Sequence, residues 1–144
     1  MIMLSSSWIF WALLSAGFAA LTALCAKIGV STIDSDLATF IRTLVILGVL
    51  GTILLVTGKF HSTEGFNPRA CLFLLLSGLA TGASWLCYFR ALKMGDAVRV
   101  APLDKLSVVF VAILGVTVLG EQLSVKGWLG IAFIGLGAIL VSLS

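Results

Sequence analysis

Long apolar runs dominate this chain and are separated by short polar segments. The runs are continuous, without the apolar–polar alternation of barrel strands, which favours helices. Each run approaches or exceeds the about 20 residues that a helix needs to cross a bilayer. They occupy residues 8–28, 35–57, 69–93, 97–119 and 125–143. The pattern therefore predicts an all-α integral membrane protein, with five transmembrane helices in a single domain over residues 1–144.

Polar residues at the run boundaries fit helix starts, because short polar side chains accept hydrogen bonds from the free N–H groups there. The candidate start residues are Asp34 or Ser35, Asn67 with Pro68, Asp96 and Ser124. Pro102 follows the start of the fourth helix by about five residues. Because proline removes a backbone donor and clashes with the preceding turn, we expect the first turns of that helix to be irregular or kinked.

Composition agrees with a membrane location. Of the 144 residues, 60% are hydrophobic and 10% are charged, against roughly 25% charged in an ordinary soluble domain. The net charge of +3 does not indicate a nucleic-acid protein, since the basic residues are spread over several turns rather than gathered in one stripe. The first apolar run has no basic segment before it and is longer than a signal-peptide core. We interpret it as a retained helix.

The distribution of basic residues predicts an orientation. Five spans place the chain ends on opposite sides; we call the side of the N-terminus side A and the other side B. Side A carries Lys59, Arg69 and Lys126. Side B carries Lys27, Arg42, Arg90, Lys93, Arg99 and Lys105. By the positive-inside rule side B is cytoplasmic, which predicts a multi-pass protein of the cell (inner) membrane with its N-terminus outside.

Several charged residues lie within or next to the apolar runs on side B, where ionisable groups are costly and mark candidate functional sites. Arg42 is about two turns into the second run, Arg90 ends the third, and Asp104 and Lys105 lie two turns into the fourth. Arg90 could instead extend its side chain to the head groups. The short Asp104 side chain needs a partner or water. We expect Arg42 or Arg90 rather than Lys105, which points about 100° away on a helix.

A stripe of hydroxyl groups follows one face of the third helix, at spacings of four, three and four residues. It consists of Ser77, Thr81, Ser84 and Tyr88, with Trp85 beside it. Hydroxyl and aromatic groups together suit a cavity for an amphipathic small molecule. Hydrogen bonding between helices is the alternative interpretation. Gly130 and Gly137 lie two turns apart on one face of the fifth helix, as a helix-packing or dimer contact would require.

Catalytic motifs are missing from the sequence. There is no nucleophile elbow or phosphate-binding loop, and the three cysteines, Cys25, Cys71 and Cys87, lack metal-site spacing. The cysteines each lie in an apolar run, where we expect them to be buried. We therefore predict a protein that is not an enzyme and that uses no metal or cofactor.

The segment from Tyr88 to Val141 resembles the C-terminal part of an EamA domain, of the drug/metabolite transporter superfamily. The similarity rests on Arg90–Leu92 (RAL), Ala101–Leu103 (APL), Leu119–Glu121 (LGE) and the glycine-rich last helix. The chain is similar to the short members with a single repeat of five helices. The resemblance implies transport of a small molecule by alternating access between two inverted halves. A single repeat must then find its second half in another chain, either a second copy or a related partner inserted the opposite way.

These observations predict a secondary transporter subunit that moves a small metabolite or drug-like molecule, as an exporter and as a dimer within the lipid bilayer. The candidate substrate-binding or gating residues are Arg42, Ser77, Thr81, Ser84, Trp85, Tyr88, Arg90, Asp104 and Lys105. The alternative is a membrane assembly or regulatory partner that transports nothing. A proton-coupled multidrug exporter fits less well, because such exporters usually need an acid near the midplane and Asp104 lies away from it.

Overall fold

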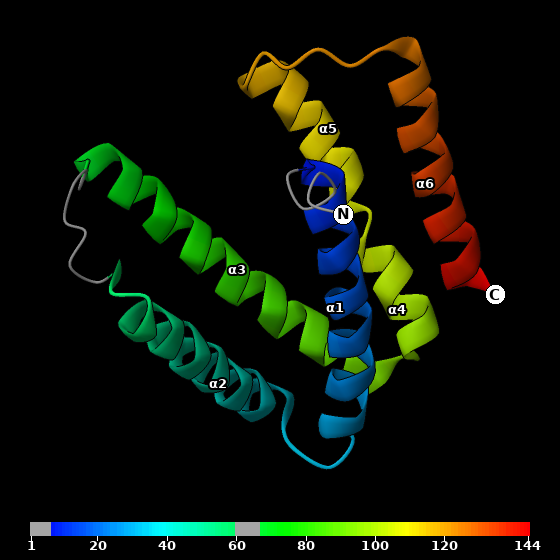
Figure 1. The fold of residues 1–144 in the computed structure, drawn as a ribbon. Helices are drawn as coiled ribbons and strands as arrows, with labels where there is room; N and C mark the ends of the chain where they lie inside the picture. The colour runs from blue at the N-terminus through cyan, green and yellow to red at the C-terminus, as the bar shows by residue number, and fades with distance from the viewer. Residues whose placement is uncertain (1–6, 60–66) are drawn as a thin grey trace. The chain divides into compact units, whose positions relative to one another are not determined.

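The computed structural model describes residues 7–59 and 67–144, and the longer elements within these ranges are all α-helices (Figure 1). They are α1 Trp8–Gly29, α2 Ser35–Val56, α3 Pro68–Met94, α4 Ala97–Asp104, α5 Ser107–Val118 and α6 Val125–Leu143. Helices α1, α2, α3 and α6 are each long and apolar enough to cross a membrane, and α4 with α5 forms a fifth candidate span. The predicted class, an all-helical membrane protein with five spans, is confirmed.

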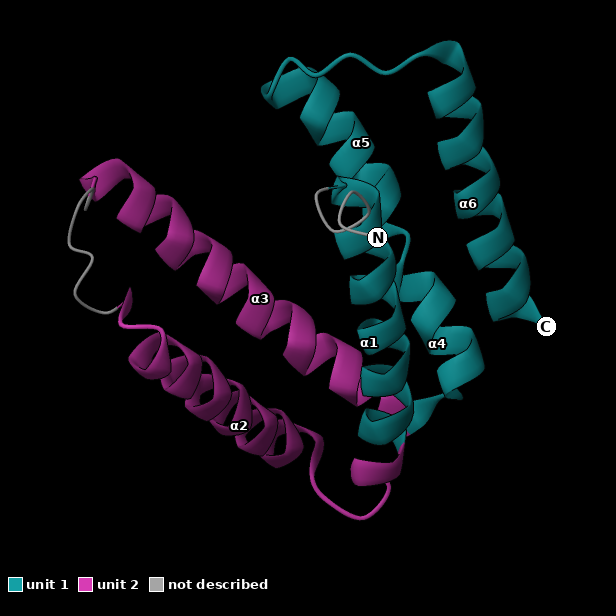
Figure 2. Ribbon diagram, in the orientation of Figure 1, with its two compact units in different colours: residues 1–27, 94–144 teal, residues 28–93 magenta. Residues whose placement is uncertain are grey.

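The chain divides into two compact units, which Figure 2 colours separately. Unit 1 consists of residues 1–27 and 94–144, and unit 2 of residues 28–93. Unit 1 therefore contains most of α1 with α4, α5 and α6, whereas unit 2 contains α2 and almost all of α3. That the five spans form a single domain stays a prediction.

Three of the predicted helix starts are confirmed by hydrogen bonds. The Asp34 carboxylate accepts from the backbone N–H groups of residues 36 and 37, at 2.9 and 3.2 Å. The Asn67 side chain accepts from residue 69 at 2.9 Å, with Pro68 as the first helical residue. The Ser124 hydroxyl accepts from residue 127 at 3.2 Å. Asp96 occupies the cap position of α4, but its side chain makes no capping bond.

The fourth span is broken, although not where Pro102 led us to expect. Its first turns are helical, and the break falls later, at Lys105 and Leu106, between α4 and α5. There the backbone switches to the tighter i→i−3 pattern: the N–H of Lys105 donates to the Pro102 carbonyl at 3.0 Å, and that of Leu106 to the Leu103 carbonyl at 3.1 Å. Such a tight turn inside a helix is a frequent site of hinges.

Within unit 1, α6 packs along α4 and α5. Gly135 makes this approach close: a Cβ atom added there would lie 3.3 Å from Cγ2 of Val109. Ala138, less than one turn further along, is buried. At the end of α5, Gly120 has a φ of +70° and turns the chain toward α6, a conformation that glycine adopts without steric cost.

Within unit 2, α2 and α3 run antiparallel as a helical hairpin (Figures 1 and 2). Its buried residues gather at the side B end of the hairpin, where α2 begins and α3 finishes. They are Val30, Ser35, Thr39, Phe89 and Leu92. Most other large apolar side chains of the described ranges are exposed, as expected of surfaces that face lipid or a partner helix.

Candidate substrate-binding site

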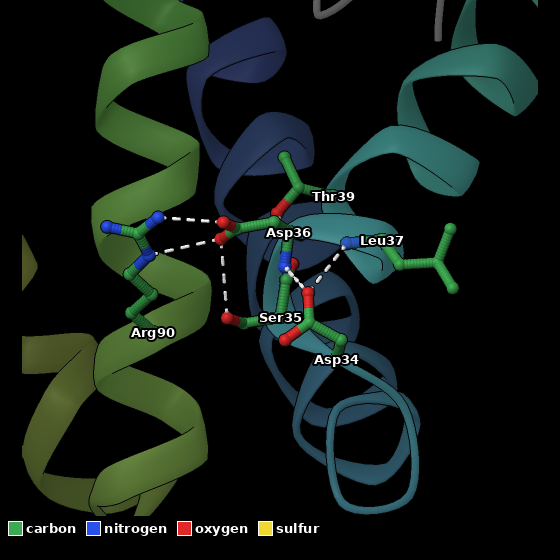
Figure 3. Close-up of polar contacts among 6 residues, drawn as sticks. All are labelled: Asp34, Ser35, Asp36, Leu37, Thr39 and Arg90. Atoms are coloured by element: carbon green, nitrogen blue, oxygen red, sulfur yellow. Dashed lines mark hydrogen bonds and ion pairs between the residues drawn. The ribbon is translucent and has the colours of Figure 1, made fainter.

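Two polar contacts hold the side B end of the α2–α3 hairpin. Nζ of Lys93 donates to the backbone carbonyl of Ile33 at 3.1 Å. Asp36 follows Ile33 by three residues, Arg90 precedes Lys93 by three residues, and the side chains of Asp36 and Arg90 are in contact (Figure 3). The equal steps in opposite directions are those of an antiparallel pair in fixed register, so these side chains set how the two helices align.

The Asp36–Arg90 pair is bidentate. Nε of Arg90 donates to Oδ1 of Asp36 at 3.0 Å, and Nη2 donates to Oδ2 at 2.7 Å. The Ser35 hydroxyl adds a long bond to Oδ1 at 3.4 Å. Both charged side chains are about half exposed in the protein. The pair therefore lies at the side B end of the hairpin, where both side chains are accessible from outside the hairpin.

Deeper along the hairpin, Arg42 lies against aromatic rings instead of a carboxylate. Its guanidinium carbon is 4.1 Å from the ring centroid of Trp85 and 5.5 Å from that of Phe89. Trp85 precedes Arg90 by five residues, which is about 7.5 Å along a helix. A cation over the face of tryptophan is attracted by the negative face of the ring. The predicted site residues Arg42 and Trp85 are thus brought together, one level below the Asp36–Arg90 pair.

The acidic residues described in unit 2 have other partners. Asp34 caps α2, and Asp36 pairs with Arg90. Neither contacts Arg42 within the 4.0 Å of an ion pair. In the described part of unit 2, the Arg42 cation therefore has aromatic neighbours and no carboxylate.

The hydroxyl stripe lies on α3 as predicted, next to Trp85. Ser77, Thr81 and Ser84 are exposed, and Tyr88 is partly buried. At 100° per residue, the stripe is centred roughly 70° from Trp85 around the helix. The Thr81 hydroxyl donates to the Ser77 carbonyl at 2.8 Å, so its proton is used within its own helix and its oxygen remains an acceptor.

Asp104 and Lys105 belong to unit 1 and lie at the break between α4 and α5. Oδ2 of Asp104 is 3.3 Å from Nζ of Lys105. We expected Asp104 to pair with Arg42 or Arg90 rather than with Lys105, and the contact with Lys105 shows that the second part of this prediction was wrong. That part assumed a continuous helix, whereas α4 ends at Asp104 and Lys105 lies in the following turn, from which its long side chain folds back. A contact of Asp104 with Arg42 or Arg90 stays a prediction.

Two features were missed from the sequence. Asp36 was not among the predicted site residues. An antiparallel alignment of the second and third helices could have placed it opposite Arg90. The expected burial of the cysteines was also wrong, because Cys25, Cys71 and Cys87 are free and exposed. Among the described residues, no group of three potential ligands could hold a metal ion.

Comparison with known proteins points to membrane transport. Residues 6–143 match the model of the EamA-like transporter family. A protein of Sinorhizobium sp, named "Uncharacterized transporter in cobO 3'region", is 63% identical over 139 residues, which cover 96% of this chain and 99% of the relative. No solved structure matches the chain.

Proposed function

The chain belongs to the EamA-like transporter family, and from this premise we propose that it is a secondary transporter subunit that exports a small metabolite or drug-like molecule. It acts in the cell membrane, with side B in the cytoplasm. The hydroxyl stripe of α3, Trp85 and Arg42 bind the molecule, and the Asp36–Arg90 pair gates its entry from side B.

The observation that carries this proposal is the position of Arg42. A guanidinium within an apolar span is costly, and a purely structural arginine would be expected to pair with an acid. Here the acids described in unit 2 are engaged elsewhere, and the cation lies beside Trp85 and near a face of hydroxyl groups. Polar groups that converge on an aromatic side chain in this way suit the recognition of a small molecule.

We assign the Asp104–Lys105 pair a gating role. It lies where the fourth span is broken by i→i−3 hydrogen bonds. Discontinuous helices in transporters commonly lie at binding sites and moving elements. A charged pair at such a turn is a local switch, because its contact depends on the geometry of the turn.

The functional unit is a dimer, either of two copies or with a related chain inserted the opposite way. This part of the proposal is supported by the five candidate spans in the described residues, since alternating access needs two inverted halves. It is also supported by α6: among the described residues, no atom outside the nearby part of α6 lies within 4 Å of a Cβ added at Gly130 or Gly137.

Flux in proteoliposomes tests the proposal. Purified protein is reconstituted, and accumulation of a panel of labelled amino acids and organic acids is measured by counterflow. We expect at least one compound to accumulate. We also expect Arg42→Ala, Arg90→Ala and Asp104→Ala each to abolish its flux while the protein stays folded. Arg69→Ala is the control, because this residue lies in the first turn of α3, at the opposite end of that helix.

Undiminished flux in all three variants would contradict the site. An absence of flux, together with no thermal stabilisation by any compound of the panel, would support the alternative function, a membrane assembly or regulatory partner.

A further inference from the structure

We propose that Arg42 anchors an anionic oxygen group of the transported molecule, so that the substrate is an organic acid rather than a neutral or cationic compound. This inference rests on the proposed transport function and adds the chemical class of the substrate to it. It is carried by the geometry around Arg42 on α2 and Trp85 on α3.

The contact with Trp85 leaves the hydrogen-bonding capacity of Arg42 available. A guanidinium has five N–H donors, and a cation–π contact at 4.1 Å engages the face of the ring without giving any donor an oxygen acceptor. A carboxylate is the group whose two oxygens match the planar fork of arginine. Trp85 thus holds the guanidinium in place while its N–H donors remain suited to an anion.

Charge balance favours the same occupant. A cation in an apolar span loses its hydration, and a cation–π contact returns only about 0.5–2 kcal/mol. Asp34 and Asp36, the carboxylates described in unit 2, cap α2 and pair with Arg90. An arriving anion would neutralise Arg42, whereas an amine would place a second positive charge beside it.

A lipid phosphate offers the same anionic oxygen chemistry, but the position of Arg42 favours a soluble substrate. Trp85 lies about 7.5 Å further along the helix axis than Arg90, and the Asp36–Arg90 pair occupies the level nearer the end of the hairpin. The phosphate of a lipid head group would therefore contact Arg90 before it reached Arg42. The exposed hydroxyl group of Ser84, next to Trp85 in the sequence, is then suited to the uncharged body of the substrate.

Thermal stabilisation of the purified protein in a neutral detergent tests the charge preference. The probes are two matched sets: benzoate, benzamide and benzylamine; and isovalerate, isovaleramide and isopentylamine. Phosphatidylglycerol and phosphatidylcholine are added in separate arms. We expect the melting temperature to rise with the acids only. In Arg42→Gln the acids should bind about 10- to 100-fold more weakly, the loss expected for one charge-assisted contact. Arg69→Gln, the matched control, should bind them as the unmodified protein does.

Equal stabilisation by amides or amines would overturn the inference, and so would no stabilisation by any probe, or an acid response that survives in Arg42→Gln. A response to phosphatidylglycerol without one to the acids would assign Arg42 to lipid. If Arg42→Gln does not fold, Arg42→Lys is compared with the unmodified protein on the same panel of probes. Lysine keeps the charge but loses the planar fork, so the acids should stabilise this variant less.

The outcomes separate this inference from the proposed function. Flux of a neutral or cationic compound that is unaffected by Arg42→Gln would leave transport standing and refute the acidic substrate. Acid binding that depends on Arg42, in a protein without flux, would refute transport and leave the anion site standing.

Discussion

Individual charges at the rim of the hairpin are placed where the helix termini favour them. Asp36 lies in the first turn of α2, and Arg90 lies close to the end of α3. A helix N-terminus carries partial positive charge and a C-terminus partial negative charge, so each residue is favoured by its own helix before the two meet. Their bidentate contact then fixes the alignment of the helices more than it adds stability, since exposed ion pairs contribute little.

A double-mutant cycle should detect the Asp36–Arg90 contact. Asp36→Asn and Arg90→Gln each remove the ion pair, so each should lower the melting temperature slightly, and the double variant should lower it no further than one single variant. Thermal unfolding followed by intrinsic fluorescence measures this. Asp34→Asn is the control, because asparagine caps a helix as well as aspartate. Additive losses in the double variant would show that the two residues act independently.

At the scale of the element, α6 has two different glycine faces. Gly135 lies against α5, 3.3 Å from Val109 if a Cβ is added. Gly130 lies five residues before it, about 140° around the helix, and shares its face with Gly137. In the described part of the chain, a Cβ added at either of these two positions would have no neighbour within 4 Å apart from nearby atoms of α6 itself. One face therefore packs within unit 1, and we propose the other as the dimer contact.

Leucine on the open face should weaken the dimer without disturbing the protomer. Gly137→Leu removes the close approach that small residues allow between membrane helices. We expect dimerisation to weaken by about tenfold or more, equivalent to about 1.4 kcal/mol. Single-molecule photobleaching in bilayers measures the dimer fraction. Gly17→Leu on α1 is the matched control, since it too meets no atom within 4 Å. An equal effect of both variants, or of neither, would exclude this face as the contact.

At the scale of the whole molecule, local sequence information was enough for the helices but not for their contacts. The apolar runs and the caps at Asp34 and Ser124 depend on residues close together in sequence, and they were predicted correctly. The Asp36–Arg90 pair joins residues 54 positions apart, so it depends on the register of two helices. Lys105 was misjudged because the helix break changes the geometry on which the 100° rule depends. Contacts between distant charged residues therefore could not be assigned from local sequence alone.

The excess of basic residues on side B predicts how the molecule sits in the membrane. In a background with Cys25, Cys71 and Cys87 replaced by serine, Asp96→Cys marks side B and Gln122→Cys marks side A. With side B cytoplasmic, an impermeant maleimide added to intact cells should label Gln122→Cys and spare Asp96→Cys. A permeant maleimide should label both and serves as the accessibility control.

The opposite pattern would reverse the orientation. Labelling of both positions to about half by the impermeant reagent would show dual insertion. The sides differ by only six basic residues against three, and a difference this small permits dual insertion. Two oppositely inserted copies would supply the inverted halves that alternating access requires, and a single chain would then suffice for transport. A fixed orientation would instead require a second, differently charged chain as the inverted partner.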